Sequence, residues 1–235
     1  MLNSTTVRSS ASKLDKEKKV HGARINAFSK RVLDWFETAG RSFPWRRKGE
    51  PLYRLVVTEI LLQRTRAETV ARFYSTFFER YPDWPSLASA EIGDLESILQ
   101  PIGMWRQRAP RLKALGTAIV ERGGSLPSVM QELELLPAVG QYVANAALLF
   151  QGVKALPLLD AGMARVLERY FGERSLADIR YDRYLQDLSA RIVAGEHAIS
   201  LNWAVLDLAA LICRRTKPQC NECPVNQRCR YHKLN

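Results

Sequence analysis

Apolar residues recur every three or four positions along most of the chain, which is the spacing of one face of an α-helix. One such stripe runs from Ile25 to Phe36 and a second from Leu52 to Ile60. Strand patterns are nearly absent, and proline and glycine separate the apolar stretches, so the pattern predicts an all-α chain with short loops. Further helices are expected near residues 66–80, 91–99, 107–121, 128–135, 141–151, 161–171, 181–194 and 201–212, with loops at 43–51, 82–85, 101–103, 123–127, 137–140 and 157.

The first part of the chain, residues 1–22, differs from the rest. It is polar, basic and rich in serine, and it shows no apolar period. Such a composition cannot bury a core, so we expect a disordered basic tail. Two interpretations of this tail stay open, a phosphate-binding arm and an inert extension.

Charge narrows the class of partner. The 235 residues contain 35 Lys and Arg against 24 Asp and Glu, a net charge of +11. An excess of this size favours a polyanion such as DNA or RNA. The sequence has no apolar run of the roughly 20 residues that a membrane span needs, and no apolar signal-peptide core. We therefore expect no membrane partner and a cytoplasmic, nucleoid-associated protein.

Four cysteines lie close together near the C-terminal end of the sequence, in the spacing C-x6-C-x2-C-x5-C, and the chain has no others. In a reducing compartment such a group is typical of a metal site rather than of disulfides. Zinc and a 4Fe-4S cluster both accept four thiolates, and the spacing by itself leaves the choice open. The predicted ligands are Cys213, Cys220, Cys223 and Cys229.

The stretch "LLPAVGQYVANAALLF", residues 135–150, combines a helix end, a tight Pro/Gly turn and a new helix. A turn of this kind leaves backbone N–H groups free at a helix N-terminus, where they can bind a phosphate. The stretch therefore resembles a helix-hairpin-helix, which clamps a DNA backbone. A plain pair of antiparallel helices would have much the same pattern.

Two carboxylates are candidates for catalysis. Asp160 lies between the apolar run "ALPLL" and a helical pattern, where a helix N-cap is the ordinary interpretation. Glu59 lies on the apolar stripe of its helix, four residues after Leu55. A carboxylate that faces a core must be paired or have a raised pKa, and either is typical of a catalytic group, although a Glu at the edge of such a stripe often reaches solvent.

Seven pieces of the sequence, between about residues 24 and 232, together resemble the helix-hairpin-helix superfamily of DNA glycosylases. This superfamily includes endonuclease III, adenine glycosylases of the MutY type and T/G-mismatch thymine glycosylases, and the last group is the most similar. The pieces are the cysteine spacing, which is that of the family's 4Fe-4S cluster, and "FPWR" (43–46), "TEILLQRT" (58–65), "IGMWRQRA" (102–109), "LPAVGQYVANA" (136–146), "LLDAGMARVL" (158–167) and "LNWAVLDLAALIC" (201–213).

The resemblance implies a base excision repair enzyme with two helical lobes, acting as a monomer on double-stranded DNA that contains a mismatched or damaged base. The target nucleotide would be flipped out of the duplex. One lobe would span residues 51–154 and contain the helix-hairpin-helix. The other would combine 23–50 with 155–235 and end in the iron-sulfur cluster loop.

The resemblance also assigns roles to single residues. Asp160 falls on the family's catalytic Asp, whose carboxylate stabilises the oxocarbenium-like sugar and orients or deprotonates the attacking water. Glu59 matches the pocket Glu of adenine and T/G-mismatch glycosylases. Gln63 matches a residue near the gap that the flipped base leaves, and Met104 matches the loop position that enters the base stack.

Pro137, Val139 and Gly140 fall on the hairpin of the family and imply DNA contact. The chain departs from the usual L-P-G-V-G at one position, where Ala138 replaces the first glycine. If this residue needs a positive φ, alanine there costs on the order of 1 kcal/mol.

Tyr142 decides the type of reaction in this family. Bifunctional members have a Lys at this position, whose amine forms a Schiff base and allows strand cleavage. A phenol cannot form that imine, so we expect a monofunctional enzyme that releases the base with water and has no AP lyase activity.

The same position bears on the choice of base. Adenine glycosylases usually have Ser here and a further C-terminal domain, whereas Tyr with Asp is typical of T/G-mismatch enzymes. We therefore expect removal of thymine or uracil opposite guanine. The alternatives are an adenine glycosylase acting opposite guanine or 8-oxoguanine, a non-catalytic DNA-binding protein, a zinc-binding regulatory module and a bifunctional lyase.

Overall fold

The computed structural model describes residues 20–234, and within this range it contains helices, turns and loops but no strand. The all-α prediction is confirmed. The expected disordered tail lies outside the described residues except for its last three positions, and among the described residues the first helix, α2, begins at Gly22. No helix in the described part of the chain is long and apolar enough to cross a membrane.

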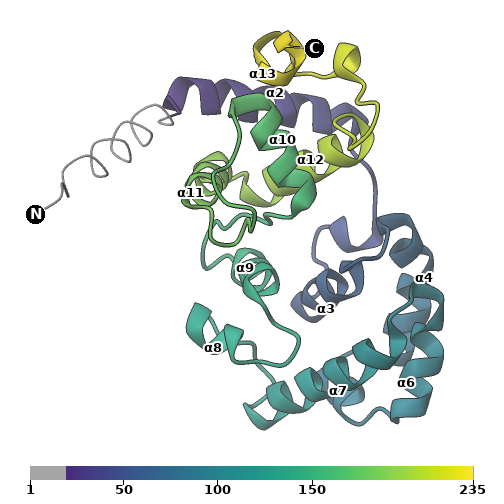
Figure 1. Ribbon diagram of the computed structural model, residues 1–235. Helices are drawn as coiled ribbons and strands as arrows, with labels where there is room; N and C mark the ends of the chain where they lie inside the picture. The colour runs from purple at the N-terminus through teal and green to yellow at the C-terminus, as the bar shows by residue number, and fades with distance from the viewer. Residues whose placement is uncertain (1–19, 235) are drawn as a thin grey trace, which may run out of the picture. The chain divides into compact units, whose positions relative to one another are not determined.

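The chain forms two compact units, and each has its own hydrophobic core (Figure 1). Unit 1 combines the residues up to Gly40 with those from Pro157 onward, and unit 2 spans Arg41–Leu156. The boundary lies ten positions before the expected one after residue 50. The reason is local, because Phe43 and Trp45 are buried in the core of unit 2, where their rings stack with centroids 4.6 Å apart.

Unit 1 is built around α12, a helix that is apolar on nearly all sides and packs against both α2 and α10. Phe28, Leu167 and Leu208 are fully buried in its core. The elements of unit 1 are α2 (Gly22–Ala39), α10 (Ala161–Phe171), α11 (Arg183–Ile192), α12 (Ala198–Leu211), the short 3-10 helices η3 (Cys220–Glu222) and η4 (Asn226–Arg228), and α13 (Arg230–Leu234).

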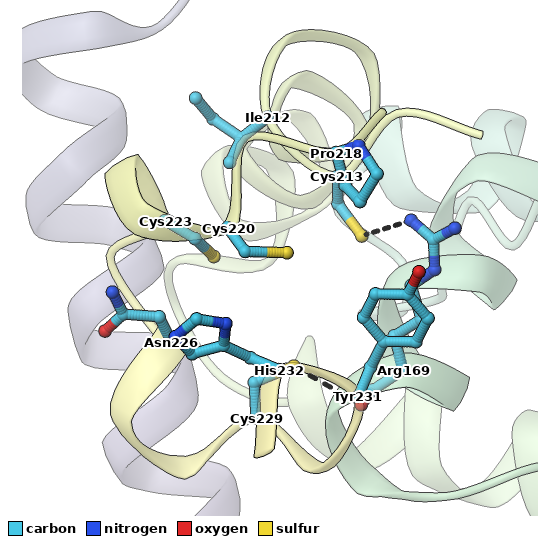
Figure 2. Close-up of a pocket in the computed structure, with 10 residues that line it drawn as sticks. All are labelled: Arg169, Ile212, Cys213, Pro218, Cys220, Cys223, Asn226, Cys229, Tyr231 and His232. Atoms are coloured by element: carbon cyan, nitrogen blue, oxygen red, sulfur yellow. Dashed lines mark hydrogen bonds between the residues drawn. The ribbon is translucent and has the colours of Figure 1, made fainter. Parts of the chain in front are cut away.

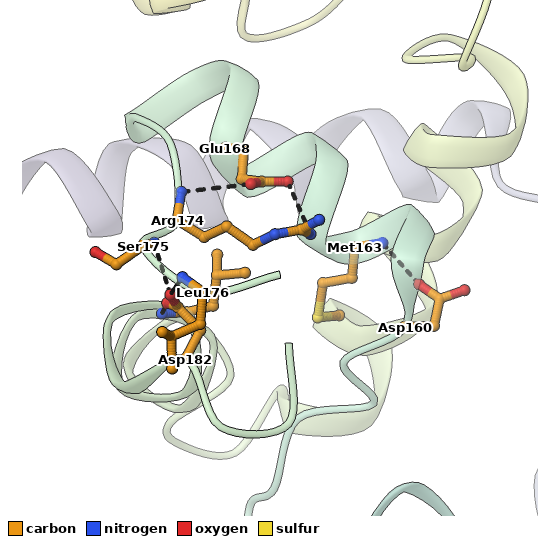
Figure 3. A network of polar contacts seen from close by, with 8 residues as sticks. Asp160, Met163, Glu168, Arg174, Ser175, Leu176 and Asp182 are labelled. Carbon is orange, nitrogen blue, oxygen red and sulfur yellow. Dashed lines mark hydrogen bonds and ion pairs between the residues drawn. The ribbon is translucent and has the colours of Figure 1, made fainter. Parts of the chain in front are cut away.

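A buried carboxylate fixes the loop between α10 and α11 (Figure 3). Oδ1 of Asp182 accepts a hydrogen bond of 2.8 Å from the backbone N–H of Leu185 and so caps α11. Oδ2 accepts from the N–H groups of Ser175 and Leu176, both at 2.7 Å. Since three backbone donors converge on one side chain that is 1% exposed, the loop is held without regular secondary structure.

Unit 2 has a core rich in aromatic rings, with Phe77 and Phe78 at its centre. Its helix α3 packs against α9, and α5 and α6 pack against α7. The elements of unit 2 are η1 (Pro44–Arg46), α3 (Leu52–Leu62), α4 (Ala67–Arg80), α5 (Trp84–Ala88), α6 (Ile92–Leu99), η2 (Gln100–Ile102), α7 (Trp105–Glu121), α8 (Met130–Glu134) and α9 (Gln141–Phe150).

Helix α5 begins inside the stretch 82–85, which the sequence pattern assigned to a loop. Its start is a capping box, in which Oδ1 of Asp83 accepts from the N–H of Ser86 at 2.8 Å and the Ser86 hydroxyl accepts from the N–H of Asp83 at 3.2 Å. Pro85 lies in the first turn, where a missing N–H costs nothing. The proline that indicated a loop therefore begins a helix.

Candidate active site and cysteine cluster

Glu59 lies on α3 of unit 2, and its side chain is 4% exposed. The hydroxyl of Tyr142, in the first turn of α9, donates a hydrogen bond of 3.1 Å to its Oε2. The packing of α3 against α9 brings the two residues together. Glu59 is thus buried and hydrogen-bonded and does not reach solvent as a Glu at the edge of an apolar stripe often does.

The turn before α9 has the geometry of a helical hairpin. It joins α8 to α9, which pack against each other, and the side chains of Leu136 and Val139 are buried. The N–H of Val139 donates to the carbonyl of Leu136 at 3.2 Å, and no side chain caps α9 at Gly140. Ala138 has φ of 63°, the left-handed region, so the strain expected at this substitution is present. The sequence-predicted Pro137 lies in the same turn and is half-buried.

Asp160 is the N-cap of α10 in unit 1, and its Oδ1 accepts a hydrogen bond of 2.7 Å from the N–H of Met163 (Figure 3). The carboxylate reaches the surface, yet the protein around it displaces enough water to raise its pKa above the ordinary value. The backbone N–H groups of Met163 and Gly162 oppose this rise. The structure thus combines the N-cap that the local sequence indicates with a carboxylate in an unusual environment.

Gly162 gives the Asp160 carboxylate its space. A Cβ atom at this position would lie 3.1 Å from Oδ1 of Asp160 and 3.2 Å from the Cβ of Ala209 on α12. Both distances are shorter than nearly all real contacts of a Cβ atom. A glycine two residues after the N-cap is therefore part of the site.

A buried amide holds the segment that leads to Asp160. Asn202, on α12, is fully buried and accepts a hydrogen bond of 2.6 Å at Oδ1 from the N–H of Leu158. Its Nδ2 donates to the carbonyl of Ala198 at 2.9 Å. Sequence reasoning missed Asn202, although an amide inside an apolar helix indicates a buried partner.

Gln63 and Met104 lie in two loops of unit 2 that are tied to each other. Gln63 is the exposed C-cap of α3, and Met104 is the N-cap of α7, 40% exposed, with φ of 55°. The hydroxyl of Thr65 donates to the carbonyl of Ile102 at 3.1 Å and joins the two loops. The structure thus brings these two sequence-predicted residues into neighbouring loops at the end of the helix that carries Glu59.

The four cysteines line one pocket of unit 1 (Figure 2). Sγ of Cys213 accepts a hydrogen bond of 3.5 Å from the Arg169 guanidinium, and Sγ of Cys229 donates to the Arg169 carbonyl at 3.3 Å. Burial and the neighbouring thiols raise the pKa of Cys220 and raise that of Cys223 to about 11. Within residues 20–234, no three His, Cys, Asp or Glu side chains are placed to hold a single metal ion.

Helix α10 also fixes the loop that begins at Cys213. Nε of Arg165 donates to the Cys213 carbonyl at 2.8 Å. One turn later, Arg169 donates to the carbonyls of Arg214 and Arg215 at 2.8 and 3.1 Å, and its guanidinium lies 4.5 Å from the centre of the Tyr231 ring. The cysteines are thus held from one side by cationic side chains, which suits a group with a negative charge.

The sequence of residues 57–199 matches the model of the HhH-GPD superfamily base excision DNA repair proteins. This stretch covers more than half of the chain and includes the hairpin and Asp160. The chain belongs to this superfamily.

Relatives within this superfamily match nearly the whole chain. A thymine-DNA glycosylase of Aeropyrum pernix is 37% identical over 214 residues, which cover 89% of this chain and 96% of that protein. A thymine/uracil-DNA glycosylase of Pyrobaculum aerophilum is 35% identical over 87% of this chain and 90% of its own length. Among solved structures, a thermostable thymine-DNA glycosylase superimposes with a TM-score of 0.84 at 29% identity, covering 91% of this chain and 98% of its own.

Proposed function

We propose that this chain is a monofunctional DNA glycosylase that removes thymine or uracil opposite guanine from double-stranded DNA. The observation that carries the proposal is the hydrogen bond from Tyr142 to Glu59, in the first turn of the hairpin helix. The relatives that match the chain over nearly its full length, one for thymine and one for thymine or uracil, support the choice of base.

The reaction uses water as its nucleophile. The residue at the family's amine position is Tyr142, and a phenol cannot form the imine that strand cleavage requires. Asp160 stabilises the positive charge that develops on the sugar as the base leaves, and it orients or deprotonates the attacking water. Its N-cap hydrogen bond fixes the carboxylate before substrate binds, and its raised pKa makes it a better proton acceptor than an ordinary Asp.

The choice of a pyrimidine rests on the relatives named for thymine or for thymine and uracil, and the chemistry of the leaving base agrees with it. Adenine leaves most readily after protonation of a ring nitrogen, so an adenine glycosylase needs a carboxylic acid that can donate a proton. Glu59 is buried and hydrogen-bonded to the Tyr142 hydroxyl, which fixes the position of its carboxyl group. Thymine and uracil leave as anions and need no proton from Glu59, which then positions water or the base.

Adenine DNA glycosylases are also among the relatives of this chain, and they define the second candidate. A panel of duplexes separates the two. The protein is incubated with T·G, U·G, A·G and A·8-oxoguanine duplexes, and abasic sites are then cleaved with alkali. Cleavage of the T and U strands only after alkali supports a monofunctional pyrimidine enzyme. Cleavage confined to the A strands overturns the choice of base, and a protein–DNA adduct trapped by borohydride overturns the absence of lyase activity.

We further propose that Cys213, Cys220, Cys223 and Cys229 hold a 4Fe-4S cluster. In a zinc site each sulfur lies about 2.3 Å from the ion, which places the sulfurs about 3.8 Å from one another. The four thiols here surround a common pocket, and Arg165 and Arg169 bind the same loop, which suits a negatively charged group. When bound, the cluster would tie the loop after α12 to itself through these four cysteines.

The cluster is tested on purified protein by absorbance near 400 nm and by iron, sulfide and zinc content. Four irons and four sulfides per chain agree with the proposal, whereas one zinc and no sulfide contradict it.

The same preparation gives the oligomeric state, for which we propose a monomer, since each chain has both the hairpin and Asp160. A DNA substrate would place the protein with the nucleoid.

A further inference from the structure

Arg108 is a buried cation that the proposed reaction does not use. It lies in the first turns of α7, is 5% exposed, and makes no ion pair among the described residues. Burial lowers its pKa, and within residues 20–234 its second terminal nitrogen, NH1, has no hydrogen-bond partner. Burying a guanidinium with an unpartnered nitrogen costs free energy, so net stability does not explain its position.

The contacts of Arg108 join two loops. Its NH2 donates a hydrogen bond of 2.7 Å to the Gln63 carbonyl and one of 3.1 Å to the Thr65 hydroxyl. The same hydroxyl donates to the carbonyl of Ile102, next to the turn that carries Met104. One guanidinium thus fixes the loop after α3 and, through Thr65, the loop before α7.

The helix termini explain why a cation lies here. The Gln63 carbonyl is at the C-terminal end of α3, where the partial negative charge of the helix favours a cation. Arg108 is also near the N-terminal end of α7, where the helix disfavours a positive charge. The interaction of the Arg108 charge with the dipole of its own helix α7 is therefore unfavourable, whereas its interaction with the dipole of α3, the helix that carries Glu59, is favourable.

Both loops contain a non-glycine residue with a left-handed backbone. Arg64 has φ of 57° and Met104 has φ of 55°. Each such residue costs about 1–2 kcal/mol and persists only where surrounding contacts impose it. The hydrogen bonds of Arg108 and Thr65 link the loops that contain these two positions, and Met104 is an exposed apolar side chain on one of them.

We propose that Arg108 is a positioning residue that holds the Gln63–Arg64 and Gly103–Met104 loops as one wedge for unstacking the target base. The inference rests on the proposed glycosylase function, because such an enzyme must open the base stack before it can reach the sugar. An apolar side chain inserted between bases does this when its backbone is fixed. Loss of the link leaves the chemistry of Asp160 intact and lowers the fraction of bound DNA that is opened.

The test uses Arg108→Met, Arg108→Lys and Thr65→Val. Thr65→Val removes the bridging hydroxyl with little change in volume, and Arg108→Lys keeps the charge without the fork that reaches two acceptors. Arg111→Met, at an exposed arginine one turn later, controls for the lost charge. Thermal unfolding identifies any variant that fails to fold. If Arg108→Met is one of them, Thr65→Val still tests the proposal.

The first readout is base unstacking without chemistry. A T·G duplex contains 2-aminopurine beside a 2′-fluoro thymidine, in which the fluorine blocks cleavage of the glycosidic bond. We expect wild-type protein and Arg111→Met to raise the fluorescence, and Arg108→Met and Thr65→Val to raise it severalfold less at saturating protein. A full rise in both of these variants overturns the proposal.

The second readout is the single-turnover rate on a U·G duplex, which should fall by about tenfold to a hundredfold in Arg108→Met, as expected for a displaced wedge. The single-turnover rate of the double variant Arg108→Met/Thr65→Val should be no lower than that of the slower single variant, because the two substitutions break the same link. Additive losses contradict a shared role. If wild-type protein releases neither thymine nor uracil but the fluorescence pattern holds, the proposed function fails and the role of Arg108 in unstacking stands.

Discussion

The Tyr142 hydroxyl donates a hydrogen bond of 3.1 Å to Oε2 of Glu59, a residue 83 positions earlier in the chain. A buried carboxylate and the first turn of the hairpin helix therefore act as one unit. In the proposed reaction, Tyr142 takes the place of the amine that bifunctional members of the family have, which favours attack by water.

Tyr142→Lys should introduce strand cleavage, because it places a primary amine at the hairpin position where bifunctional enzymes have one. The measurement is borohydride trapping of the variant on a U·G duplex, followed by gel electrophoresis. Tyr142→Phe is the matched control, since it also removes the hydrogen bond to Glu59 but offers no amine. Equal trapping in the two variants, or none in either, would contradict the placement of this side chain near the sugar.

Base release should begin to decline on the acid side at a higher pH than an unperturbed Asp would cause. The pKa of Asp160 is raised by burial above its ordinary value of about 3.9, so the carboxyl becomes protonated, and unable to accept a proton or stabilise a cation, before an ordinary Asp would. The measurement is the single-turnover rate on U·G DNA against pH, with binding to the same duplex as the control. A rate that stays constant down to the ordinary pKa would exclude Asp160 as the titrating group.

Asp160→Asn should abolish release of the base and leave binding to the duplex largely intact.

Gly162→Ala should slow base release by about tenfold, an effect of the size expected for a displaced catalytic group. The new methyl group would lie 3.1 Å from Oδ1 of Asp160, so the carboxylate must move. Gly93→Ala is the control, because Gly93 lies within α6 and a Cβ there meets nothing within 4 Å. Alanine favours a helix at both positions, so helix propensity does not distinguish the two variants. A rate loss confined to Gly162→Ala, with an unchanged unfolding temperature, therefore reports on the Asp160 carboxylate. Equal rates in the two variants would contradict the crowding.

Ala138→Gly should raise the free energy of unfolding by about 0.5–1 kcal/mol. The change removes the strain of a left-handed alanine, and the greater freedom that glycine gives the unfolded chain cancels only part of this gain. Ala138 has φ of 63° in the hairpin turn. Urea unfolding of the variant gives the value. Ala114→Gly, at an exposed position within α7, should act in the opposite direction by about 1 kcal/mol. A loss of stability at both positions would show that the turn does not strain Ala138.

Periodicity predicted the helices of this chain well because their apolar stripes are long, and it failed where a helix is short. Helix α5 is five residues long, and its signals were the capping residues Asp83 and Ser86 rather than a stripe. The same stripe argument that indicated a buried, paired Glu59 applies to Arg108, which lies in line with Leu112 and Leu115 on α7. The same signal is therefore present at both positions.

Contacts between distant parts of the chain were beyond the sequence pattern. Spacing along one helix fixes which face a residue lies on, but not which other helix covers that face. The partner of Glu59 and the link from Asn202 to Leu158 therefore required the packing of the units. The hairpin was different, because its turn is encoded within a few adjacent residues, from Leu136 to Gly140.

The order in which the chain is synthesised acts on the two units differently. Unit 2 is one continuous segment, so all of its core exists once Leu156 has been made. Unit 1 joins α2 to helices that come after unit 2, and Phe28 waits for Leu167 and Leu208. At about 5–20 residues per second, the stretch of residues 41–156 alone separates its two halves by roughly 6–23 s of translation. The apolar face of α2 is thus a nascent surface that a ribosome-associated chaperone has time to bind.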